Sequence, residues 1–117
     1  MESPLIIRAL LSSAEILELA RRDFGDMIKV VVDIKRGIMA AGGELHADSE
    51  ALLITDGSAQ DDIWGANYYP EREPGKRLEY SAMLNIRPAR GNRSQEIGSE
   101  KVRTELRAVV ERIMGAA

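Results

Sequence analysis

The only histidine of the chain lies in a short, mostly acidic stretch. Four charged or titratable side chains are spaced two residues apart in it: Glu44, His46, Asp48 and Glu50. If the stretch is extended, the alternation of side chains along a strand places all four on one face. One imidazole among carboxylates suits a divalent metal ion as cofactor, and the candidate ligands are Glu44, His46 and Asp48.

The same stretch fits an acid–base site that needs no metal, as in a small hydrolase or lyase. The candidate catalytic residues are then His46, Asp48 and Glu50. His46 would be the general base, oriented by Asp48 or Glu50, because an imidazole changes its protonation near neutral pH. If the stretch is helical, His46 and Glu50 meet one turn apart and the alignment of the four is lost. A polar loop with an inert, hydrogen-bonded His46 is the remaining interpretation.

A second cluster is basic and covers the end of a long predicted strand and the loop after it. Its candidate ligand-binding residues are Asn85, Arg87, Arg90, Asn92, Arg93 and Ser94. Guanidinium groups bind carboxylate or phosphate oxygens through two parallel hydrogen bonds. The segment has neither a G-x-x-x-x-G-K pattern nor a G-x-G-x-x-G pattern, so it is not a known nucleotide-binding loop. It predicts binding of a small anionic ligand or an acidic partner protein. The alternative is a solvated loop whose arginines pair with acids of the chain itself.

A third stretch, Asp61–Tyr69, holds the only tryptophan and two of the three tyrosines. Trp64 and Tyr68 fall on one face of a predicted strand, which indicates a strand that anchors the core. The alternative is a pair of aromatic rings beside a polar pocket. The neighbouring acids argue against base stacking of a nucleic acid on these rings.

Hydrophobic periodicity predicts the elements that position these clusters. A capping box formed by Ser12 and Glu15 begins a helix over residues 13–24. A last helix is capped by Ser99 and carries an apolar stripe that ends at Ile113. Period-two alternation and turn residues predict the strands: Leu5–Arg8, Met27–Lys35, Ile38–Ala40, Ala51–Thr55, Ile63–Tyr69 and Leu78–Arg87.

These elements predict one α+β domain over residues 1–117, in the order β-α-β-β-β-β-β-α. The sheet is mostly antiparallel, with five to six strands, because consecutive strands joined by short connections are usually neighbours. The N-terminal and C-terminal helices pack on one face. The other face is left open with Val31 and Met83 on it, so we expect association into a two-fold homodimer.

Composition restricts the class of protein further. The 117 residues include no cysteine, which excludes disulfides and thiolate sites and fits a reducing compartment. The start, Met-Glu-Ser-Pro, lacks the features of a signal peptide, and no apolar run approaches the ~20 residues of a membrane span. We therefore expect a cytoplasmic protein without a membrane partner. The net charge of −3 argues against a nucleic-acid partner.

Six groups of residues carry a resemblance that spans about residues 15–112. They are Asp33–Ala40, Gly42–Glu50, Asp56–Ser58, Trp64–Gly65 with Tyr69–Pro70, Asn85–Pro88, and Gly91–Ser94. Together they resemble a small prokaryotic family catalogued only as a domain of unknown function. The resemblance implies no reaction, ligand or cofactor. The leading hypothesis is therefore anion or partner binding through the second cluster, with the small enzyme and an assembly subunit without a small ligand as alternatives.

Overall fold

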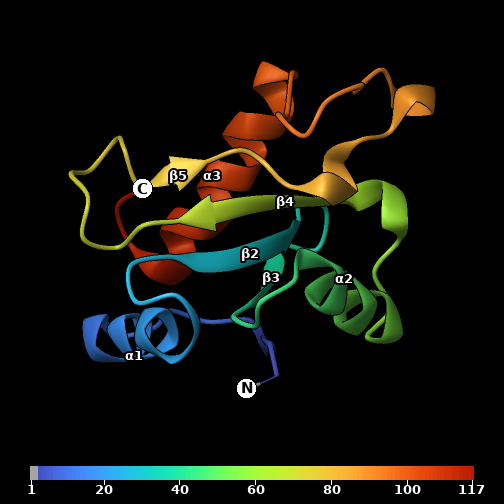
Figure 1. Cartoon of the computed structure of the whole chain (residues 1–117). Helices are drawn as coiled ribbons and strands as arrows, with labels where there is room; N and C mark the ends of the chain where they lie inside the picture. Colours follow the sequence, from blue (N-terminus) through green and yellow to red (C-terminus); the bar gives the residue numbers. More distant parts are fainter. Residues whose placement is uncertain (1–2) are drawn as a thin grey trace.

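The computed structural model describes residues 3–117 and consists of a five-stranded antiparallel sheet with three α-helices (Figure 1). The strands are β1 (Leu5–Ile7), β2 (Ile28–Asp33), β3 (Ile38–Ala41), β4 (Ile63–Tyr68) and β5 (Leu78–Glu79), in the spatial order β1-β3-β2-β4-β5. The helices are α1 (Ser13–Asp23), α2 (His46–Thr55) and α3 (Glu100–Met114). The predicted α+β class and antiparallel sheet are confirmed, but the order is β-α-β-β-α-β-β-α.

Both predicted helices are present and begin at the predicted caps. Ser12 Oγ accepts a hydrogen bond from the backbone N–H of Glu15 at 3.1 Å, and the Glu15 carboxylate accepts from the N–H of Ser12 at 2.9 Å. Ser99 Oγ caps α3 by accepting from the N–H of Val102 at 3.2 Å. As predicted, α1 and α3 pack on the same face of the sheet, in one core with Val30, Val32, Trp64, Ala66 and Tyr68. Within residues 3–117, no helix has the length and apolar character needed to cross a bilayer.

The segment Ala51–Thr55, predicted as a strand, is the second half of α2. An apolar run this short fits a buried strand or a buried helical turn equally well. Ser49 and Leu53, one helical turn apart, are both fully buried, which settles the helical alternative. Helix α2 covers the second face of the sheet, in a core with Val31, Ile38, Ala40 and Ile63. The prediction of an open sheet face is therefore wrong, and an uncovered face no longer supports a dimer there.

The strand predicted at Leu78–Arg87 forms only at its first two residues, β5. The chain then leaves the sheet and makes two 3-10 turns, η2 (Met83–Asn85) and η3 (Pro88–Arg90). The side chain of Asn85 takes the place of the missing strand. Its Oδ1 accepts from the N–H of Gly65 at 2.8 Å, and its Nδ2 donates to the carbonyl of Gly65 at 2.9 Å. One amide thus satisfies both backbone groups that a neighbouring strand would have paired.

A buried carboxylate fixes the end of α2 to the turn between β2 and β3. Asp33 is fully buried, and its Oδ1 accepts from the N–H groups of Lys35 and Arg36 at 2.9 and 2.8 Å. Its Oδ2 accepts from the hydroxyl of Ser58 at 2.6 Å, just after α2. Arg36 also donates to Asp56 at 2.8 Å. This network sets the position of α2, and hence of His46 at its first turn, over the sheet.

Candidate functional site

The acidic stretch was considered either extended or helical, and it is helical from His46, where α2 begins. The helix sends the candidate side chains in different directions. His46 turns toward β4, Asp48 lines a hollow beside the N-terminal segment, and Glu50 lines a hollow with Arg87. Glu44 is exposed before the helix. The four side chains therefore do not lie on one face, as they would on an extended backbone.

The metal hypothesis rested on that alignment. Among residues 3–117, no group of three or more Asp, Glu or His side chains is placed so that it could hold a metal ion. Metal binding by Glu44, His46 and Asp48 stays a prediction, without support from the geometry.

The imidazole of His46 is oriented by the backbone of β4. Its Nε2 lies 2.8 Å from the carbonyl oxygen of Ala66. A carbonyl can only accept, so Nε2 carries the proton and Nδ1 of the neutral ring keeps its lone pair. Asn67 is the side chain that lies within hydrogen-bonding reach of the ring, with a smaller effect on the pKa of His46 than the Ala66 carbonyl has. The prediction that Asp48 or Glu50 orients the ring is wrong, because the Ala66 carbonyl does so.

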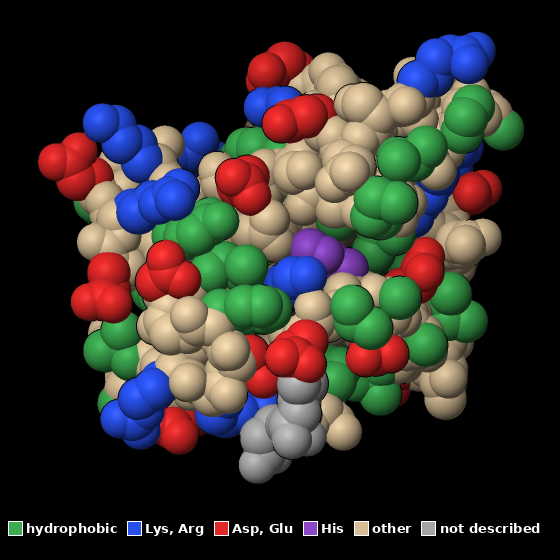
Figure 2. Space-filling model, viewed as in Figure 1, with side chains coloured by type: hydrophobic (Ala, Val, Ile, Leu, Met, Phe, Trp, Pro, Cys, Tyr) green, Lys and Arg blue, Asp and Glu red, His purple; other side chains and the backbone are tan. Residues whose placement is uncertain are grey.

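Gly65 allows the ring and the η2 segment to approach the sheet. A Cβ on Gly65 would lie 3.4 Å from Cδ2 of His46 and 2.5 Å from the Cβ of Ala82. The second distance is far inside the contact distance of two carbon atoms, so a side chain here would displace Ala82. Figure 2 shows the side chain of this histidine, coloured purple, in a hollow of the surface with a basic group beside it.

Lys29 of β2 and Asn67 of β4 are the polar side chains of the sheet that influence this ring. They lie directly opposite each other in the pairing of β2 with β4, and Asn67 shares the face of Gly65 that α2 covers. Burial lowers the pKa of His46 below its usual value of 6.5, and the hydrogen bond to Ala66 opposes this shift. The charge of Lys29 lowers this pKa further, and Asn67 opposes with a smaller effect. The imidazole is therefore neutral at neutral pH.

The charge of Lys29 is not neutralised by a carboxylate. Its ammonium lies 5.3 Å from the centroid of the Phe24 ring, and it forms no ion pair within residues 3–117. The neighbouring Asn67 donates from Nδ2 to the Glu79 carboxylate at 2.7 Å. A molecule that entered the hollow would meet the positive charge of Lys29 and the imidazole of His46.

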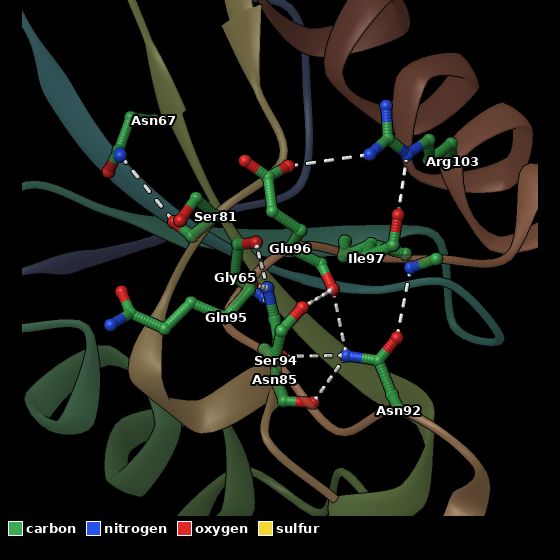
Figure 3. A network of polar contacts seen from close by, with 11 residues as sticks. Gly65, Asn67, Ser81, Asn85, Asn92, Ser94, Gln95, Glu96, Ile97 and Arg103 are labelled. Carbon is green, nitrogen blue, oxygen red and sulfur yellow. Dashed lines mark hydrogen bonds and ion pairs between the residues drawn. The ribbon is translucent and has the colours of Figure 1, made fainter.

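Two of the predicted ligand-binding residues, Asn85 and Asn92, are buried and hold the chain together (Figure 3). Nδ2 of Asn92 lies within 3.0 Å of the carbonyl oxygens of Asn85, Ser94 and Glu96. Its Oδ1 accepts from the N–H of Gly98 at 2.9 Å. Since the amides of Asn85 and Asn92 are saturated with backbone partners, these residues have a structural role.

Arg87 is also partly built into the fold. Its Nη2 donates to the carbonyl of Ile63 at 2.7 Å, and the guanidinium carbon lies 4.9 Å from the centroid of the Trp64 ring. Burial lowers the pKa of Arg87, although a guanidinium stays charged at any physiological pH.

The outer part of the basic loop is more open. Arg90 pairs with Asp61 at 3.1 Å, and Ser94 Oγ donates to the carbonyl of Glu96 at 3.4 Å. Arg93 is exposed and forms no ion pair in the described part of the chain. Of the six predicted ligand-binding residues, Arg90, Arg93 and Ser94 are exposed and therefore accessible to a ligand.

The sequence had shown His46 but had not shown its neighbours. Lys29 was placed on a half-buried strand and Asn67 on a strand that anchors the core, and they meet because β2 pairs with β4. A signal was present, since each is a polar residue inside a largely apolar strand. The pairing that gives this signal a meaning was hidden by the incorrect strand at Ala51–Thr55.

Comparison with curated proteins and with solved structures finds no match. One family model matches the chain over residues 5–113, and its description is "Protein of unknown function (DUF5674)". The match includes α2, the basic loop and every residue around His46. It agrees with the resemblance found from the sequence motifs. The chain belongs to the DUF5674 family.

Proposed function

We propose that this DUF5674 domain is a small acid–base enzyme, a hydrolase or a lyase, in which neutral His46 accepts a proton. One observation carries the proposal: Nε2 of His46 is fixed on the Ala66 carbonyl, while Nδ1 keeps its lone pair in a surface hollow. A general base must be held in place and must be unprotonated at the working pH. The lowered pKa of His46 meets the second requirement.

The surroundings of the ring support a charge-separating step. When Nδ1 takes a proton from a water molecule or from an acidic C–H group, the ring becomes an imidazolium and the donor becomes negative. The Ala66 carbonyl continues to accept from Nε2–H and stabilises the charged ring. The ammonium of Lys29 stabilises the negative charge. In hydrolysis the activated water attacks the substrate, and in elimination the new carbanion expels the leaving group; the imidazolium then returns its proton to the product.

The test is a screen for turnover of esters, phosphate esters and β-substituted acids by the wild type and by His46→Gln. Glutamine retains an amide N–H group for the Ala66 carbonyl but has no basic nitrogen. We expect kcat to fall by about 10²–10⁴-fold, the usual contribution of a general base. The matched control is Asp48→Asn, two residues along the same helix, which should retain activity. Unchanged turnover in His46→Gln, or an equal loss in Asp48→Asn, would contradict the proposal.

A second candidate function is binding of an anionic ligand or an acidic partner surface by the outer basic loop. It is favoured by the Arg90–Asp61 pair, whose side chains are 44% and 68% exposed. Such exposed pairs contribute at most about 1 kcal/mol, so another anion can replace Asp61 at little cost. Arg93 adds a second accessible charge to the same loop.

The second candidate has its own test, thermal stabilisation by phosphate, phosphorylated metabolites and dicarboxylates. The double variant Arg90→Gln/Arg93→Gln should lose any stabilisation that the wild type shows, while its own unfolding midpoint stays the same. Retained stabilisation by the anion would exclude the loop as its binding site.

A further inference from the structure

The first strand of the chain lies at an edge of the sheet. β1 pairs with β3 in the register Leu5 with Ala41 to Ile7 with Met39, and no strand of the described chain lies on its other side. An edge strand presents unpaired backbone N–H and C=O groups. An additional strand can pair with such an edge and continue the sheet.

Hollows lie beside β1 on both faces of the sheet. On the α1 face, a hollow of about 750 Å³ lies between β1 and α1, with Leu5, Ile7, Leu10 and Leu11 among its lining. On the α2 face, a hollow of about 490 Å³ is lined by Pro4, Leu52 and other residues. A strand placed beside β1 sends alternate side chains to the two faces. Such a strand would therefore lie beside both hollows.

The larger hollow is bordered by leucines that face solvent. Leu10 is 70% exposed and Leu5 is 51% exposed. Clustered apolar side chains of this kind mark a surface that another chain covers. Four charged residues of both signs surround them, so a partner need not carry one sign of charge: Arg8, Glu15, Glu18 and Arg22.

We propose that the strand beside β1 is the β1 strand of a second copy of this chain, paired antiparallel about a two-fold axis. The exposed Leu5 and Leu10 need an apolar cover, and the same two residues of a second copy can supply it, while Ile6 and Ile7 of each copy stay packed in their own cores. A two-fold interface requires one surface that is complementary to itself. The edge strand with its two hollows provides that surface, and two five-stranded sheets join into one.

Light scattering over a dilution series tests the association. The wild type should have twice the chain mass of 12.9 kDa at high concentration. Leu10→Glu should have half the wild-type mass. The matched control is Met83→Glu, which replaces a side chain that is 67% exposed on η2 and should leave the dimer intact. Circular dichroism confirms that both variants are folded. A monomeric wild type, or a dimeric Leu10→Glu, would overturn the proposal.

Cross-linking tests the strand pairing itself, since the chain has no cysteine of its own. In an antiparallel pair of identical strands, positions near the two-fold axis lie opposite their own copies. At least one of Leu5→Cys, Ile6→Cys and Arg8→Cys should give a covalent dimer on mild oxidation, and Met83→Cys should not. Cross-linking in Met83→Cys alone would contradict the pairing. A monomeric wild type that binds a peptide with apolar residues on both faces would assign the edge to another partner and overturn the second copy.

Discussion

Two polar regions meet at Gly65 of β4, and they differ in how completely their polar groups are paired. On one side, the buried amides of Asn85 and Asn92 are saturated with backbone partners. On the other side, the ring of His46 has a single backbone partner, and Lys29 has no carboxylate partner among residues 3–117. Saturated buried groups stabilise a fold, whereas accessible unpaired groups are available to a ligand. Pairing, rather than residue type, distinguishes the structural region from the candidate site.

The largest effect is expected in the saturated region. Asn85→Ala removes an amide that serves both backbone groups of Gly65 and the carbonyl of Gln95. Each buried group left unpaired costs about 1–3 kcal/mol, so the free energy of unfolding in urea should fall by about 3 kcal/mol or more. The matched control, Asn67→Ala, lies on the side of His46 and loses a bond to the exposed Glu79. It should lose less than about 1 kcal/mol. Equal losses in the two variants would remove the distinction between the regions.

A second prediction concerns the residue at which the regions meet. Gly65→Ala introduces a Cβ only 2.5 Å from the Cβ of Ala82. Overpacking of this kind costs about 1–3 kcal/mol, which a urea titration measures. Adding Ala82→Gly removes the closest contact and should restore part of the lost stability. If Gly65→Ala alone is as stable as the wild type, the close approach of Ala82 to β4 is not the reason for a glycine at this position.

The parts of the fold that the sequence predicted correctly have local signals. The capping box of Ser12 and the cap at Ser99 fixed the two helices, and alternation identified β2 and β4. The two errors concern segments whose structure depends on distant partners. Ala51–Thr55 is helical because Leu53 packs against the sheet, and Leu78–Arg87 leaves the sheet because Asn85 can replace a strand. Neither contact can be recognised from spacing along the chain.

The residues of the candidate site also divide into those that the sequence could identify and those that it could not. His46 could be selected from the sequence because it is the only histidine and titrates near neutral pH. Its carboxylate neighbours were chosen on an extended backbone, and the helix separates them. Asn85, at the end of the predicted strand, and Asn92, in the loop after it, were chosen as hydrogen-bond donors for a ligand. The sequence alone does not distinguish an amide that binds a ligand from one that binds the backbone. Burial and hydrogen bonds distinguish the two cases, and both depend on the tertiary structure.

A smaller effect is expected in the dependence of stability on pH. The pKa of His46 is lowered in the folded state, so the unfolded chain binds a proton more readily. The folded state therefore loses stability as pH falls below the usual histidine pKa of 6.5, until the folded pKa is reached. Each unit of pKa difference corresponds to about 1.4 kcal/mol. His46→Gln should lack this part of the loss when unfolding free energies are compared from about pH 8 to about pH 5. Parallel curves for the wild type and the variant would contradict the shift.

The most direct test of the account is the pKa of His46, measured from the NMR signals of its ring. One histidine gives one titration curve without assignment. The account predicts a pKa below 6.5 in the wild type and a higher value in Lys29→Met, because a neighbouring positive charge is removed while burial remains. Lys35→Met, an exposed lysine in the turn after β2, is the control and should leave the curve unchanged. A wild-type pKa at or above 6.5, or the same pKa in Lys29→Met, would contradict a neutral His46 held ready beside a positive charge.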